Sequence, residues 1–208
     1  MTPAELQEAV RLGMERARRA SSTLAEQGWS LPMLLSPAGT YRVLKAGSPA
    51  EIDAQFVRLY DADEGWLFDR LADDLLNRDG LSSWRILLEQ TISAYRRREF
   101  AITVPALLTI CEGVLMRSEG NSTGLRAVVR ERAKAEQHRF PESVHAILWH
   151  NVHGFVDELF KRSDFSGPRP SRLNRHSILH GRDVPTWTQA DCLRLFQAVH
   201  TLSSLNVE

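Results

Sequence analysis

Cysteine is nearly absent from this chain of 208 residues: Cys111 and Cys192 stand alone, with no C-x-x-C spacing. Disulfide frameworks and thiolate metal sites need more cysteines, or closely spaced ones, so the sequence argues against both. Glycine-rich phosphate loops, dinucleotide-binding fingerprints, internal repeats and low-complexity tracts are missing too. These absences argue against the common nucleotide-dependent enzymes, and we expect neither a cofactor nor a metal ion.

Long apolar runs are also scarce. The sequence shows no run that approaches the roughly 20 apolar residues of a membrane-crossing helix, and the chain begins with the polar, acidic stretch Met1 to Glu5 rather than a signal peptide. We therefore expect a cytoplasmic protein with no membrane partner. The apolar share of 43% and the charged share of 25% are ordinary for a globular domain and argue against intrinsic disorder.

An excess of charge of either sign is lacking, because 26 Lys and Arg balance 26 Asp and Glu. This balance argues against a protein that coats nucleic acid with a broadly basic surface. The distribution is uneven, since residues 1–80 carry nine basic against thirteen acidic residues and residues 81–208 carry seventeen against thirteen. The most basic segment is 161–182, where six Lys and Arg face one Asp. Either a site for an anion or a solvated loop explains this segment.

Apolar residues recur at helical spacing along most of the chain, and strand patterns are sparse. Capping boxes predict one helix that begins at Thr2 and another that begins at Thr186 to Gln189, and a helical pattern resumes near Ser48. Two largely buried helices are expected between Trp84 and Leu115. The predicted fold class is therefore all-α, a helical bundle.

Turn residues gather at 28–48, which also contains Trp29, either a packed aromatic or a stacking platform for a ligand. We predict an N-terminal helical extension over residues 1–80, with this turn-rich stretch inside it, and a helical domain over residues 81–208. A further turn is expected at Gly120 to Gly124.

Two groups of polar residues on predicted helices need an explanation. His150, His153 and Asp157 are spaced to line one face and bind zinc, but without an H-E-x-x-H motif we favour ordinary core or surface residues. Glu112 falls within an apolar helix, where an unpaired carboxylate is costly. Its expected partner is Arg175, His176 or His180, or else a nearby structural arginine.

The segment with the clearest chemistry reads Asn174-Arg175-His176-Ser177-Ile178-Leu179-His180-Gly181. Arginine presents a planar fork that suits phosphate oxygens, and histidine can both give and take a proton near neutral pH. On a regular helix, Arg175 and His180 would lie about 140° apart. Arg172, His176 and His180, at i, i+4 and i+8, would share one face and add a supporting arginine.

This segment resembles the R-x4-6-H motif of HEPN nucleases, in the form N-R-H-x3-H-G, and the resemblance extends loosely over residues 80 to 205. It implies a bundle of HEPN type and a homodimer in which two motifs meet across a cleft and cut RNA without a metal ion. His180 would then be the general acid or base, and Arg175 would stabilise the phosphorane. Asn174 and His176 would position the phosphate or hold the imidazole tautomer.

The resemblance further implies attack by the 2′-hydroxyl, a 2′,3′-cyclic phosphate product and inertness towards DNA. A toxin or antiphage effector is one setting for such a ribonuclease. Two alternatives stay open: a non-catalytic HEPN-like module that acts with a partner effector, and a structural helical dimer in which the motif residues only cap and pin helix ends.

Overall fold

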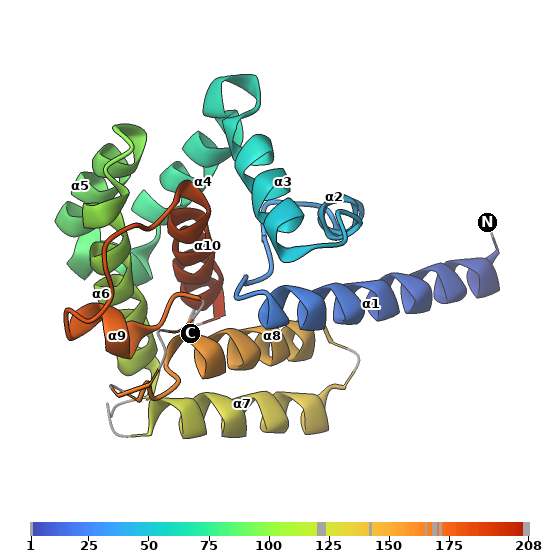
Figure 1. Cartoon of the computed structure of the whole chain (residues 1–208). Coiled ribbons are helices and arrows are strands. Elements are labelled where there is room, and N and C mark those ends of the chain that lie inside the picture. Colours follow the sequence, from blue (N-terminus) through green and yellow to red (C-terminus); the bar gives the residue numbers. More distant parts are fainter. Residues whose placement is uncertain are drawn as a thin grey trace.

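The computed structural model describes residues 2–119, 124–141, 143–164, 166–167, 170 and 172–205. In these residues the chain forms α-helices and two short 3-10 turns and no strand, which confirms the predicted all-α class (Figure 1). The expected turn at 120–124, apart from Gly124, and Arg169 of the basic segment lie outside the described residues.

The helices differ in length and in the connections between them, of which the longest joins α8 to α9. They are α1 (Pro3–Glu26), α2 (Pro37–Leu44), α3 (Pro49–Asp61), α4 (Trp66–Leu76), α5 (Arg85–Arg96), α6 (Phe100–Glu119), α7 (Leu125–Arg139), α8 (Val144–Leu159), α9 (Arg175–Leu179) and α10 (Gln189–Leu205), with 3-10 turns η1 (Asp63–Gly65) and η2 (Asp79–Trp84).

Local capping explains where several helices begin. Thr2 and Ser48 each form a capping box with the glutamate three residues later, and a proline follows each cap at the first helical position. The Ser36 side chain accepts a hydrogen bond from the backbone N–H of Gly39 and caps α2, so the stretch 28–48 contains a helix that was not predicted. The last helix is capped by Thr188, which pairs reciprocally with Asp191, two residues later than the expected cap.

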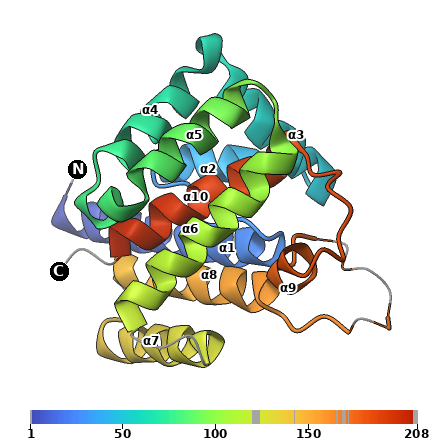
Figure 2. The same cartoon turned by 90° about the vertical axis from the view of Figure 1, so that its left-hand side faces the viewer.

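The bundle is organised around α10, nearly all of whose residues are buried. It packs against α6, α3, α4 and α8, and α5 covers the other side of α6. Helices α1, α8 and α7 lie side by side in that order, and the N-terminal half of α1 runs beyond α8 (Figure 1). Figure 2 shows α10 and α6 crossing in front of this layer.

The first 80 residues share one hydrophobic cluster with the rest of the chain. Ser21 donates to the carbonyl of Ile147, and Asn151 returns a hydrogen bond to the carbonyl of Ser21. Near the other end of the chain, Thr201 donates to the carbonyl of Leu31 at 3.0 Å. A boundary at residue 80 stays a prediction, and any such boundary divides a common core.

Helix α6 carries an 18-residue stretch, Phe100–Arg117, with a mean hydropathy of 1.6. By length and composition this stretch is apolar enough to cross a membrane, so the expectation that no run is long enough was wrong. Core helices of globular domains pass the same test, and here α6 packs between α5 and α10. Cytoplasmic localisation stays a prediction.

Candidate functional site

The motif begins at the cap of α9, a helix of only five residues. The Asn174 side chain accepts a hydrogen bond from the backbone N–H of Ser177 at 2.9 Å and donates one to the carbonyl of Lys161 at 2.8 Å. Asn174 is 4% exposed. Gly181, with φ of +67°, turns the chain away after α9. Asn174 therefore fixes where α9 starts and ties it to the end of α8.

Arg175 binds Glu112 in a two-pronged ion pair between α9 and α6. Its Nη2 lies 2.7 Å from Glu112 Oε1, and its Nε lies 3.1 Å from Oε2. The two side chains are 29% and 23% exposed, so the pair is half-buried. Arg175 is thus the partner that the carboxylate in the apolar helix required, as one of the sequence alternatives predicted.

His176 and His180 bring their rings together at the outer side of α9. The ring centroids are 4.6 Å apart, and the planes are inclined by 71°. His176 is half-buried, whereas His180, just past the end of the helix, is exposed. Two imidazoles therefore meet next to an arginine that a carboxylate holds in place.

The surroundings of His176 favour its neutral form. Burial, followed by the positive charges of His180, Arg162 and Arg175, lowers the pKa of His176 below its usual value. An imidazole with a lowered pKa is ready at neutral pH to accept a proton.

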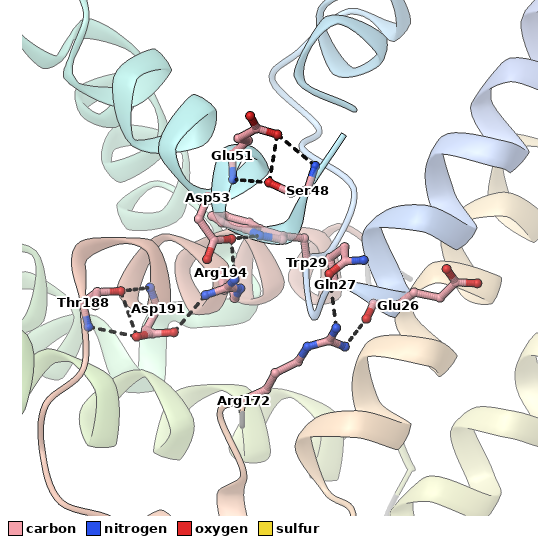
Figure 3. A network of polar contacts seen from close by, with 10 residues as sticks. All are labelled: Glu26, Gln27, Trp29, Ser48, Glu51, Asp53, Arg172, Thr188, Asp191 and Arg194. Atoms are coloured by element: carbon pink, nitrogen blue, oxygen red, sulfur yellow. Dashed lines mark hydrogen bonds and ion pairs between the residues drawn. The ribbon is translucent and has the colours of Figure 1, made fainter. Parts of the chain in front are cut away.

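Arg172 binds the N-terminal helix rather than joining His176 and His180. Its guanidinium donates to the carbonyl of Glu26 and to Oε1 of Gln27, at the C-terminal end of α1 (Figure 3). The predicted common face of Arg172, His176 and His180 is therefore wrong, because α9 begins only at Arg175. Arg172 instead anchors the segment that precedes α9 to the C-terminal end of α1.

The basic segment forms part of the surface next to α9. A hollow of about 490 Å³ is lined by Lys161, Arg162, Arg172 and Asn174 together with the acidic Glu158 and Asp164. Positive charge thus gathers beside the motif, although two carboxylates share the same wall.

A second arginine cluster, which the sequence did not reveal, lies under α3. Arg194 of α10 binds Asp53 and, at 2.9 Å, Asp191, and its guanidinium lies 4.8 Å from the ring centroid of Trp29 (Figure 3). Trp29 is fully buried, stacks on Phe56 and donates its indole N–H to Asp53. Trp29 is therefore a packed aromatic rather than a stacking platform.

His200 forms a third cluster, with Arg78 and Asp74. Its Nε2 lies 3.0 Å from Arg78 Nη2 and 3.6 Å from Asp74 Oδ2, and the residue is 4% exposed. Burial and the Arg78 charge lower the pKa of His200. A lone histidine among the apolar residues of the last helix was the signal that could have indicated this cluster.

The zinc alternative has little support in the geometry. In the part of the chain that the structure describes, no three His, Cys, Asp or Glu side chains gather around a common point. His153 Nε2 lies 3.5 Å from Asp157 Oδ2, and His150 bonds to Ser22 of α1. Burial raises the pKa of both Cys111 and Cys192, which makes them poor thiolate ligands.

Comparison with known proteins gives no match for this chain among family models, curated proteins or solved structures.

Proposed function

We propose that the protein is a metal-independent endoribonuclease of HEPN type. The observation that carries this proposal is the meeting of the His176 and His180 rings, at 4.6 Å, beside an arginine held by Glu112. Cleavage of RNA through its 2′-hydroxyl needs one group that takes a proton, one that gives a proton and one that stabilises the phosphorane charge. The α9 cluster supplies all three kinds of group within six residues.

The reaction would proceed with one imidazole as base and the other as acid. The base takes the proton of the 2′-hydroxyl as its oxygen bonds to phosphorus, and the acid protonates the 5′-oxygen as the P–O5′ bond breaks. His176, with its lowered pKa, suits the base, and the exposed His180 suits the acid. The products are a 2′,3′-cyclic phosphate and a 5′-hydroxyl, and DNA is inert because it lacks the nucleophile.

Arg175 would stabilise the charge that develops on the phosphorane. Its Nε and Nη2 are taken by Glu112, which leaves Nη1 outside this pair for a phosphate oxygen. Glu112 therefore acts as a positioning residue, and Asn174 positions α9 as a whole. The hollow lined by Lys161 and Arg162 would hold the neighbouring phosphates.

We also infer a homodimer that brings two α9 segments together, in a cytoplasmic toxin or antiphage effector. The second candidate is a non-catalytic HEPN-like module that acts with a partner protein. The engagement of Asn174 and Arg175 in structural hydrogen bonds favours this second function. Cleavage is the measurement that separates the two.

The decisive experiment incubates a mixed-sequence RNA with the protein in excess chelator. Cyclic-phosphate products are expected from the wild type, and His180→Ala and Arg175→Ala should each lower the rate by at least about 100-fold. His145→Ala, an exposed histidine of α8 outside the cluster, is the matched control. Circular dichroism checks that each variant is folded.

Absence of cleavage by folded wild type at every RNA tested, or equal rates for His180→Ala and His145→Ala, would contradict the ribonuclease. If the protein does not cleave RNA, a partner protein that binds the wild type but not Arg175→Ala would support the binding module.

A further inference from the structure

A second concave surface lies between α7 and α8, outside the α9 cluster. It encloses about 460 Å³ and is lined by Arg130, Lys134, His138, His150 and His153, with Ala133 and Gln137 between them. Five of the seven lining residues carry a basic side chain, and no acidic residue belongs to this described lining. A chain with no net charge has therefore gathered basic groups along one groove.

Regular spacing along α7 produces one wall of the groove. Arg126, Arg130, Lys134 and His138 follow one another at intervals of four residues. Four helical residues rise about 6 Å, so the series extends over roughly 18 Å. Arg126, one turn before Arg130, donates to Asp157 of α8 at 2.9 Å and does not line the groove. The other three basic residues form a row rather than a point.

The opposite wall presents the imidazoles of His150 and His153. Ser22 Oγ lies 3.3 Å from His150 Nε2. His153 Nε2 lies 3.5 Å from Asp157 Oδ2, a distance longer than that of a good hydrogen bond. An imidazole N–H donates to a phosphate oxygen in either protonation state. Since His153 Nε2 is buried and His150 Nε2 contacts Ser22, the donors that this wall can offer to an anion are the Nδ1–H groups of the two rings.

An exposed aromatic residue ends α7. Phe140 follows His138 by two residues, is 53% exposed, and has the Arg139 guanidinium 5.1 Å from its ring centroid. A basic groove combined with an exposed aromatic ring is the arrangement by which proteins bind single-stranded nucleic acid without reading its sequence. In such proteins an aromatic ring stacks on a base while the cations follow the backbone.

We propose that the groove between α7 and α8 binds the sugar–phosphate backbone of a single-stranded nucleic acid, with a base stacked on Phe140. The open, elongated groove suits a flexible linear polyanion better than a free phosphate, which needs converging donors. An acidic peptide would gain nothing from the exposed ring. This inference deepens the proposed function, and rests on it only for the choice of RNA as the natural strand.

Glu131 restrains the cations of the groove. It accepts from Lys134 at 3.1 Å and from Arg130 at 3.3 Å, and the Lys134 hydrogen bond lowers the pKa of its carboxyl group. A phosphate that enters the groove competes with this carboxylate for both cations. Removal of Glu131 should therefore strengthen binding, the opposite of the effect of removing its partners.

The test measures binding of a fluorescent 12-nucleotide oligo-dT by anisotropy over a series of salt concentrations. DNA lacks the 2′-hydroxyl, so the result does not depend on ribonuclease activity. Replacing both Arg130→Gln and Lys134→Gln should weaken binding at least about tenfold and reduce the salt slope by about 1.4. The matched control replaces Arg70→Gln and Arg85→Gln, two surface arginines with acidic partners four residues later, and should change binding less than about twofold.

Three single variants make the test more specific. Glu131→Gln should tighten binding about two- to fivefold, whereas Glu136→Gln, on another side of α7 and paired with Arg132, should leave it unchanged. Phe140→Ala should weaken binding at least about fivefold. Equal binding by the groove variant and the Arg70/Arg85 control would overturn the proposal. Displacement of oligo-dT by poly-glutamate as effectively as by unlabelled oligo-dT would overturn it in favour of an acidic peptide.

Discussion

Arginine and carboxylate side chains meet in two contrasting places in this molecule. Between α9 and α6, Arg175 and Glu112 are 29% and 23% exposed, and His176 and His180 lie next to Arg175 on α9 and at its end. On α10, the Arg194 side chain is 13% exposed, holds two aspartates and lies over a buried tryptophan ring. The same residue types thus form an accessible cluster on a short helix and an internal connection between long ones.

The difference shows that composition alone does not distinguish a site from a scaffold. Arg194 joins α10 to α3 and to its own helix cap, so every hydrogen bond it makes is internal to the fold. Arg175 is also anchored, but its neighbour His176 is half-buried and His180 is exposed, so a substrate can reach both rings. Accessibility of the neighbouring groups, rather than the ion pair itself, makes the α9 cluster a candidate for chemistry.

The largest effect expected on stability comes from Arg194→Ala. It leaves Asp53 and Asp191 without their shared cation, which should lower the free energy of unfolding by about 3 kcal/mol. Arg96→Ala is the control, because its pair with Asp69 is 55% exposed on both sides and should cost less than about 1 kcal/mol. Urea unfolding measures both, and equal losses would show that the internal pair is no stronger than a surface one.

A pH-dependent loss of stability should trace to His200. Because the folded state keeps this imidazole neutral while the unfolded chain binds a proton near pH 6.5, stability is lost as the pH falls below about 6.5. Between pH 7 and pH 5 the Tm of the wild type should fall by about 5 °C more than that of His200→Gln. Thermal unfolding at several pH values measures this, and parallel curves for the two proteins would rule out His200 as the cause.

Asn174→Ala should lower the free energy of unfolding by about 1–2 kcal/mol, since it removes a helix cap and a donor to the Lys161 carbonyl. Asn174→Ser keeps a capping oxygen and should lose less. Chemical denaturation provides the values. If Asn174→Ala were fully stable yet inactive, Asn174 would act on the substrate rather than on the position of α9.

The smallest effect concerns the titration of His176. Its pKa should lie below 6.5 in the wild type, and should rise towards the usual value in His180→Ala because one neighbouring positive charge is removed. NMR of the imidazole C–H protons follows this titration. A pKa of His176 that is unchanged in His180→Ala would indicate that His180 does not contribute to its lowering.

Much of the architecture was predictable because it depends on local signals. The capping box at Thr2 and the helical pattern that resumes near Ser48 placed two helix starts, and helical periodicity predicted the all-α class. Glu112 in an apolar helix required a nearby cation, and Arg175 supplies it. Here local sequence and tertiary structure agree.

Other features were not predictable because they depend on contacts between distant segments. Arg172 was expected on a continuous helical face, but its partner at the end of α1 is 146 residues away. The joining of Arg194 to Asp53 and of His200 to Asp74 likewise has no local signature. Within 28–48, proline and glycine concealed α2, since Pro37 at a first helical position is equally typical of a turn.

The hydrogen bonds that join the first helices to the last ones also constrain how the chain folds during synthesis. The partner of Ser21 is made 126 residues later, and the partner of Leu31 is made 170 residues later. While the ribosome produces the chain, the apolar face of α1 therefore waits until α8 has emerged, and the segment that follows α1 waits for α10. A nascent chain stalled before α8 should therefore remain a chaperone substrate.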